Sequence, residues 1–102
     1  MPSFMLKKRF FEQYKSGKKD IELRNVQPQW KNGSVGDAAV LLCGRNILRK
    51  TIVKIHKGSL ARILLDVDYR RIFPESNTIF DAVDTTREIY PINIEFMAFE
   101  LK

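Results

Sequence analysis

The chain has 102 residues, of which 44% are hydrophobic and 29% are charged, and its formal net charge is +6. This ordinary globular composition excludes an intrinsically disordered chain, and the length fits a single domain covering residues 1–102. No apolar run reaches the roughly 20 residues that a membrane helix needs, and the first residues lack the pattern of a signal peptide, so we expect no membrane association and a cytoplasmic protein.

The chain holds one cysteine, Cys43, and one histidine, His56. A lone cysteine cannot form a disulfide within the chain, so we expect a buried thiol. A metal site built from histidine and cysteine needs more such residues, and His56 has no partner for a catalytic triad close in sequence. We therefore expect no metal and no cofactor, and we assign His56 no role.

The positive charge favours a polyanionic partner, because neutralising phosphates releases counterions and supplies affinity without sequence readout. Basic residues cluster in two stretches, residues 7–19 and residues 45–57, whereas the last third of the chain is more acidic. This asymmetry predicts one basic face. Charge alone does not establish nucleic-acid binding, because many small basic proteins bind none.

The chain opens with a short apolar stretch, residues 3–7, that predicts a strand, and an amphipathic stretch, residues 8–15, that predicts a helix. Phe10, Phe11 and Tyr14 recur in it at helical spacing. Such aromatic stripes usually pack in a core, so we expect Phe10 and Phe11 to be core residues. Two roles stay open for Tyr14, which are core packing and stacking on a base.

Gly17 follows this helix where many helices end in a left-handed residue, a conformation that glycine adopts without strain. The side chains of residues 18–24 then alternate as in a strand. Simple alternation places Lys19 on one face of this strand and Glu22 and Arg24 on the other.

The pattern Gly17-x-Lys19-x-x-Glu22-x-Arg24, followed by Val35-Gly36-Asp37 and a terminal strand after Tyr90-Pro91, resembles the ASCH domain family. ASCH domains belong to the PUA-like group of small β-barrels. The resemblance implies an α+β fold with about five to six mostly antiparallel strands and two to three helices. It also implies a basic cleft beside the barrel, lined by the lysine, glutamate and arginine of the motif, that takes RNA or a nucleotide.

Residues 25–36 are rich in turn-forming residues and predict a surface loop that carries the only tryptophan, Trp30. Trp30 has two roles that the sequence leaves open, which are stacking on a nucleobase and closing one end of the barrel as an apolar lid.

Residues 38–43 form a nearly continuous apolar run, which predicts a strand buried on both faces. A turn at residues 44–46 leads into an antiparallel strand over residues 47–56. One face of that strand is expected to carry Ile47, Arg49, Thr51, Val53 and Ile55.

Ser59 can cap a short helix over residues 60–65, and Asn77 can cap a helix over residues 78–88 that ends before a proline. Residues 92–99 then alternate as a final strand, which we expect to lie inside the sheet.

The preferred function is binding of RNA, a nucleotide or a nucleoside. Lys19 and Arg24 would contact phosphate or a base edge, while Glu22 would orient Arg24 or accept a hydrogen bond from a base amino group. The structural alternative is an exposed ladder of charges worth at most about 1 kcal/mol. The remaining candidate binding residues are Gly17, Tyr14 and Trp30.

A small hydrolase is the alternative function. One branch of the resembling family contains bacterial amidohydrolases that act on acetylated cytidine with a lysine, a threonine three residues later and a distant glutamate. The resemblance implies that Lys19 matches the lysine and Glu75 the glutamate, but Glu22 stands at the threonine position, which puts that mechanism in doubt. A Lys19 whose pKa is lowered by burial can still act with Glu22 or Glu75 as acid and base, on a modified nucleoside or as a ribonuclease.

A protein-interaction domain with a basic surface ranks third.

The site hypothesis itself carries a geometric condition, because Lys19 and Glu22 must meet at one cleft although alternation separates them. A β-bulge between them would bring them together, and we therefore predict an irregularity near residues 20–21.

Overall fold

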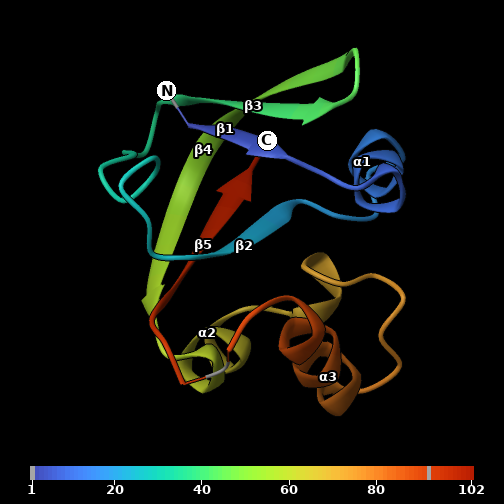
Figure 1. Ribbon diagram of the computed structural model, residues 1–102, viewed down its shortest axis with the longest axis vertical. Helices are drawn as coiled ribbons and strands as arrows, with labels where there is room; N and C mark the ends of the chain where they lie inside the picture. The colour runs from blue at the N-terminus through green and yellow to red at the C-terminus, as the bar shows by residue number, and fades with distance from the viewer. Residues whose placement is uncertain (1, 92) are drawn as a thin grey trace.

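The computed structural model describes residues 2–91 and 93–102 and has one five-stranded sheet with the strand order β1-β3-β4-β5-β2 (Figure 1). The strands pair antiparallel except β1, which lies parallel to β3. The sheet curls into half of a barrel, so the expected α+β, barrel-like fold is confirmed. The elements are β1 (Ser3–Met5), α1 (Lys8–Lys15), β2 (Ile21–Asn25), β3 (Ala38–Cys43), β4 (Asn46–Gly58), α2 (Leu60–Asp66), the 3₁₀ helix η1 (Tyr69–Arg71), α3 (Ile79–Ile89) and β5 (Phe96–Leu101).

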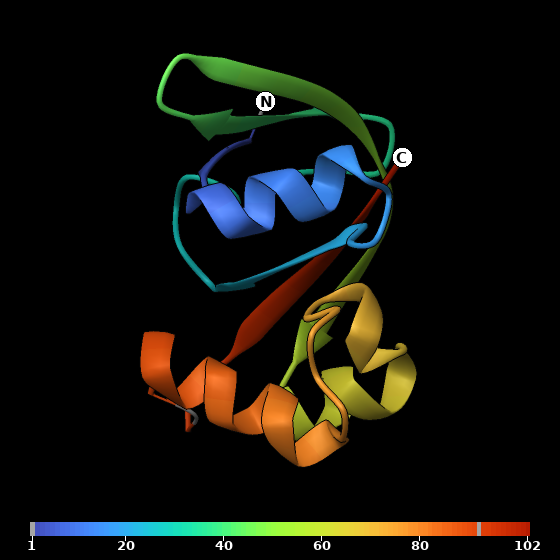
Figure 2. The same ribbon diagram turned by 90° about the vertical axis from the view of Figure 1, so that its right-hand side faces the viewer.

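Two hydrophobic clusters lie on the two faces of the β5–β2 ribbon, because alternate residues of each strand point to opposite faces. On β5, Phe99 packs with the residues of α1, and Phe96 packs with those of α2 and α3. On β2, Ile21 and Leu23 join the second cluster. Figure 2 shows α1 beside the upper part of the sheet and α2 and α3 together at its lower end.

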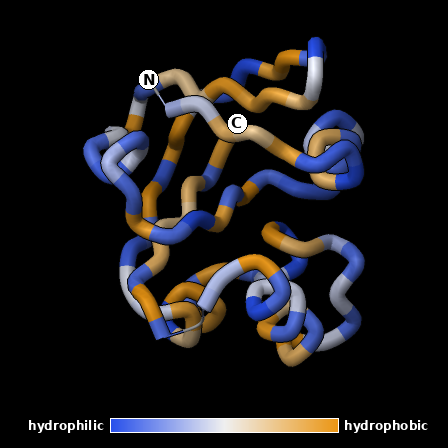
Figure 3. Tube along the Cα trace, in the orientation of Figure 1, coloured by the Kyte–Doolittle hydropathy of each residue, from blue (hydrophilic) through white to orange (hydrophobic). Residues whose placement is uncertain are grey.

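Hydropathy follows this arrangement. Figure 3 shows mostly hydrophilic residues on the loop between β2 and β3 and on the loop between η1 and α3, mostly hydrophobic residues along β3 and β5, and a mixture of both along β4. Within the described part of the chain, no helix is long and apolar enough to cross a membrane.

The long strand β4 contains the irregularity of the sheet. Its register against β5 shifts between Ile52 and Lys54, which leaves Val53 as the extra residue of a β-bulge. The bulge reverses the alternation, so Val53 is exposed while Ile55 packs against the first hydrophobic cluster. The expectation that Ile55 shares a face with Val53 is therefore wrong.

The strand β3 has the predicted bounds but not the predicted burial. Ala39 and Leu41 are fully buried, whereas Val40 and Leu42 are half-buried. The apolar run therefore lies on a sheet that is fully covered on one face only.

The helix caps follow local chemistry. Ser59 caps α2 as predicted, accepting a hydrogen bond from the Arg62 amide. The N-cap of α3 is Thr78 and not Asn77, because Thr78 and Asp81 form a reciprocal capping box one residue later. The final strand lies between β4 and β2 as expected, but it begins at Phe96; the predicted start at residue 92 lies outside the described residues.

Arg71 ties the helical region to the sheet. Its guanidinium donates to Asp20 at 2.8 and 3.1 Å and to Glu100 on β5 at 2.9 Å. Glu100 also pairs with His56 of β4 at 2.6 Å, which gives His56 a local hydrogen-bond partner. One partly buried carboxylate thus joins β4, β5 and η1.

Glu100→Gln should lower the free energy of unfolding by about 1–3 kcal/mol at neutral pH, because charge-assisted bonds from His56 and Arg71 lose their anion. Burial raises the pKa of Glu100, but the hydrogen bonds from His56 and Arg71 outweigh it and hold the pKa below 4.5. The unfolded state therefore binds the proton first, and this stabilisation is lost as pH falls through the folded pKa. Urea unfolding followed by Trp30 fluorescence should show wild type and variant converging in acid. The control Glu95→Gln, an exposed partner of Lys57, should change nothing.

Candidate functional site

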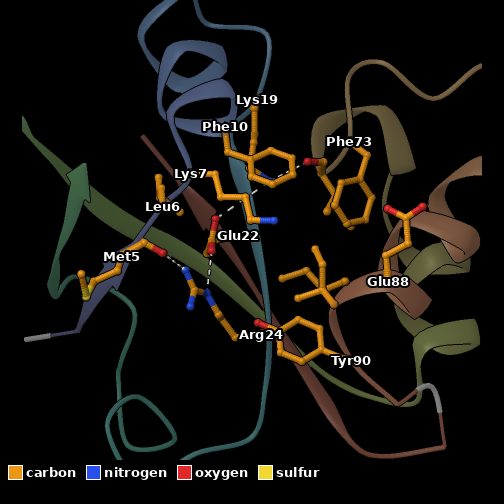
Figure 4. A pocket seen from close by; sticks show the side chains of 13 residues that line it. Met5, Leu6, Lys7, Phe10, Lys19, Glu22, Arg24, Phe73, Glu88 and Tyr90 are labelled. Atoms are coloured by element: carbon orange, nitrogen blue, oxygen red, sulfur yellow. Dashed lines mark hydrogen bonds and ion pairs between the residues drawn. The ribbon is translucent and has the colours of Figure 1, made fainter. Parts of the chain in front are cut away.

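A cavity of about 210 Å³ lies beside β2, the edge strand of the sheet, between the β1–α1 segment and the α3 end. Figure 4 shows Lys19, Glu22 and Arg24 along its wall, with Phe10, Phe73 and Tyr90 around them. The structure therefore brings together the three charged residues of the motif.

Lys19 reaches the cavity because the strand starts later than predicted. Gly17 has φ 79°, and after it the amides of Lys18 and Lys19 still bond to the carbonyl of Gln13 in α1, at 3.0 and 3.1 Å. The strand begins only at Ile21, so β alternation does not govern Lys19. The irregularity predicted near residues 20–21 is therefore a late start of the strand and not a β-bulge, and Lys19 and Glu22 meet.

The Lys19 ammonium is held by backbone oxygens. Its Nζ donates to the carbonyls of Ile21 at 2.7 Å and Ile72 at 2.5 Å, and lies 3.9 Å from the Glu22 carboxylate. The side chain thereby links β2 to the segment after η1.

Aromatic rings surround the same ammonium. Nζ lies 5.7 Å from the ring centre of Phe10, 5.2 Å from that of Tyr14 and 5.6 Å from that of Phe73. The residue is only 4% exposed. Burial lowers the pKa of Lys19 to about 8, and the attraction of Glu22 opposes that shift only in part.

Glu22 is fixed from two sides. The Tyr14 hydroxyl donates to Oε1 at 2.7 Å, and Arg24 Nε donates to Oε2 at 2.6 Å. Burial, and then the neighbouring Glu22, raise the pKa of Tyr14 well above its usual value, so Tyr14 keeps the proton that it donates. With 2% exposure, Tyr14 acts as a core residue that positions Glu22 and offers no ring face to a ligand.

Arg24 spans the gap between the two outer strands. Its Nη2 donates to the carbonyl of Met5, the last residue of β1, at 2.9 Å, while its guanidinium lies 5.2 Å from the Phe4 ring centre and 5.4 Å from that of Trp30. Trp30 donates its Nε1–H to the Asn25 carbonyl at 2.7 Å and is 8% exposed. Trp30 therefore packs beneath Arg24 in the core, away from the cavity.

Two further predicted residues lie apart from the cavity. Gly17 ends α1 and lines no part of it. Glu75 is exposed and accepts a hydrogen bond from Gln13 at 3.2 Å, in a second hollow that shares Phe10 and Phe73 with the cavity. The structure does not bring Glu75 to Lys19.

Sequence reasoning missed several cavity residues. Phe10, expected in the core, is half-buried and lines the cavity, as do Phe73 and Tyr90. The only sequence signal for the last two is that each ring precedes a proline outside a regular element.

The charge of the cavity is mixed. Lys7 and Glu88 line it together with the motif residues, so three basic and two acidic side chains face it. Among the described residues, no group of histidine, cysteine, aspartate and glutamate could hold a metal ion.

Comparison with known proteins shows similarity in structure rather than in sequence. No family model and no curated protein matches the chain. The hypothetical protein PH0355 superposes with a TM-score of 0.83 at 21% identity, over 100% of this chain and 98% of that one. Protein PF0455 from Pyrococcus furiosus gives 0.72 at 19% identity, over 99% and 94% of the two chains.

A third solved structure carries a family name in its description. The ASCH protein from Zymomonas mobilis superposes with a TM-score of 0.71 at 19% identity, over 98% of this chain and 65% of that longer chain. At this low sequence identity, the superposition establishes the fold alone. Any activity has to be argued from the residues of the site. The fold of this chain is therefore that of the ASCH protein from Zymomonas mobilis, a small α+β half-barrel, as the resemblance of the motif from Gly17 to Arg24 predicted.

Proposed function

We propose that the chain binds RNA or a nucleotide by taking one nucleobase into the cavity at Lys19, Glu22 and Arg24. The observation that carries this proposal is the convergence of these three charged side chains in a cavity with aromatic walls. Positioned donors, an acceptor and apolar rings are what a base with polar edges and π faces requires.

The donors of the site are only partly used. Arg24 presents five N–H groups, and the described structure gives bonds to Nε and Nη2, so others remain for a base carbonyl or a phosphate. Lys7 is exposed at the cavity rim and can neutralise a phosphate. The cavity is smaller than the roughly 300–1,000 Å³ of drug-sized pockets, which suits one base rather than a folded RNA element.

Lys19→Met should reduce binding of a labelled single-stranded RNA at least tenfold, about 1.4 kcal/mol, because it removes a buried charge beside the proposed base. Fluorescence anisotropy across a salt series gives the affinity, and wild-type binding should weaken steeply with salt. The matched control is Lys18→Met, which removes the neighbouring exposed charge. Circular dichroism confirms that both variants fold.

Two results would contradict the proposal. Wild type that binds neither RNA nor nucleotides at low salt would leave a protein partner as the better explanation of the basic surface. Equal losses for Lys18→Met and Lys19→Met would place binding on the general surface charge and not in the cavity.

A hydrolase remains the second candidate because of one observation. Lys19 combines burial, a pKa of about 8 and proximity to Glu22, so a fraction of it is neutral near pH 8 and can accept a proton. The separation of Glu75 restricts this candidate to Lys19 with Glu22.

The protonation of Lys19 can be measured through stability. Because the folded pKa is about 8 and the usual value is 10.5, the unfolded state binds more protons between these values, and stability rises with pH in that window. Wild type should gain up to about 3 kcal/mol of unfolding free energy relative to Lys19→Met as pH rises through it. Lys18→Met, compared with wild type, should show no such trend. If the difference in unfolding free energy between wild type and Lys19→Met does not change with pH, the pKa of Lys19 is not lowered by folding. That result would remove the hydrolase candidate.

A further inference from the structure

The outer edge of β2 carries backbone groups that no strand pairs. The strand order puts β2 at one edge of the sheet, where β5 is its only neighbouring strand among the described residues. The Leu101 amide bonds to the Asp20 carbonyl at 2.8 Å, and the Val26 amide bonds to the Glu95 carbonyl at 3.2 Å. Antiparallel ladders alternate, so even-numbered residues of β2 bond to β5, and Ile21, Leu23 and Asn25 point their backbone groups away from it.

Two of the three β2 carbonyls that point away from β5 already accept a hydrogen bond from a side chain. Ile21 accepts from Lys19 Nζ and Asn25 accepts from Trp30 Nε1, each at 2.7 Å. Between them, the N–H and C=O of Leu23 meet no partner within the described residues. Of these three residues, only Leu23 lines the cavity.

The length of this free edge decides what can pair with it. An added peptide strand bonds to alternate residues along an edge, but here the carbonyls on both sides of Leu23 are occupied. One residue offers one donor and one acceptor side by side. The matching ligand is a planar group that carries an acceptor next to a donor.

We infer that the Leu23 backbone reads the Watson–Crick edge of the bound nucleobase, its N–H donating to the base and its C=O accepting from it. A base presents such an adjacent pair on that edge and exposes two π faces, which Phe10, Phe73 and Tyr90 are placed to contact. This inference rests on the proposed function, since it specifies how the same cavity holds its base. It makes Leu23 a specificity-determining position through its main chain.

Amide hydrogen exchange tests this inference without a substitution. In the free protein the Leu23 amide should exchange faster than those of Glu22 and Arg24, which bond to β5. Nucleoside 5′-monophosphates are then added one at a time. With a ligand at about ten times its Kd, exchange at Leu23 should slow about tenfold, because only the free fraction still exchanges.

Methylated probes test which edge of the base is read. A bound pyrimidine should lose affinity when its pairing edge is blocked, as in 3-methyluridine compared with 5-methyluridine, which has the same added methyl elsewhere. The ligand used for the amide measurement is the monophosphate that binds best.

An amide-to-ester replacement isolates the donor in the protein. An ester at Leu23 removes its N–H while keeping the buried side chain and should weaken nucleotide binding about five- to tenfold, as expected for one lost hydrogen bond. The matched control is an ester at Asn25, whose N–H also points away from β5 but does not line the cavity, and it should bind as wild type does.

The outcomes separate this inference from the proposed function. If a nucleotide binds, Lys19→Met abolishes binding, and Leu23 exchange and the Leu23 ester show no effect, the backbone readout is wrong and the binding function stands. If no nucleotide binds, both are overturned. The readout would be established if nucleotide binding slows exchange of the Leu23 amide, the Leu23 ester weakens nucleotide affinity and the Asn25 ester leaves that affinity unchanged.

Discussion

The buried carboxylate of Glu22 is the constraint on which the site depends. With 4% exposure it gives up most of its hydration, a cost that is recovered only through direct partners. Its two donors come from different elements, Tyr14 on α1 and Arg24 on β2. Because Arg24 also bonds to the Met5 carbonyl at the end of β1, the partners of this one anion fix α1, β2 and β1 relative to each other.

The cavity exists because the barrel is open on this side. Within residues 2–91 and 93–102, neither β1 nor β2 has a second neighbouring strand, and a strand between them would fill the space that the ligand is proposed to use. Exposed edges invite aggregation unless they are blocked. Here side chains do the blocking, since Lys19 and Trp30 occupy the outward carbonyls of Ile21 and Asn25. The same contacts that protect the edge leave one residue of it available inside the cavity.

Local signals predicted the parts of the fold that local chemistry decides. The bounds of α1, the strand β3 and the Ser59 cap follow from periodicity and capping. The bulge at Val53 was not foreseen, because no glycine or proline marks it and it arises from pairing with β5. Likewise, periodicity separated Lys19 from Glu22 because it began the strand three residues too early.

The same distinction between local sequence signals and tertiary packing applies to the residues of the site. The motif residues lie within eight positions of one another, so a sequence motif can report them, and the convergence of Lys19, Glu22 and Arg24 was foreseeable. Phe73 and Tyr90 reach the cavity from segments about fifty and seventy residues away, through tertiary packing that leaves no periodic signal. The sequence left Tyr14 open between core packing and stacking on a base. In the structure it is buried and its hydroxyl donates to Glu22, so it packs in the core.

The hydrogen bonds of Lys19 use only two of its three N–H donors, which bears on the proposed ligand. An ammonium has three N–H donors, and two of them bond to the carbonyls of Ile21 and Ile72. Glu22 lies nearby, but the 3.9 Å between Lys19 Nζ and Glu22 Oε1 is too long for a hydrogen bond. Replacing Lys19 with an apolar side chain would leave the carbonyls of Ile21 and Ile72 without this partner, so two of its donors have a structural role. These carbonyls do not account for the third N–H donor of Lys19. Under the proposed function, a polar atom of the bound base would accept from that buried donor.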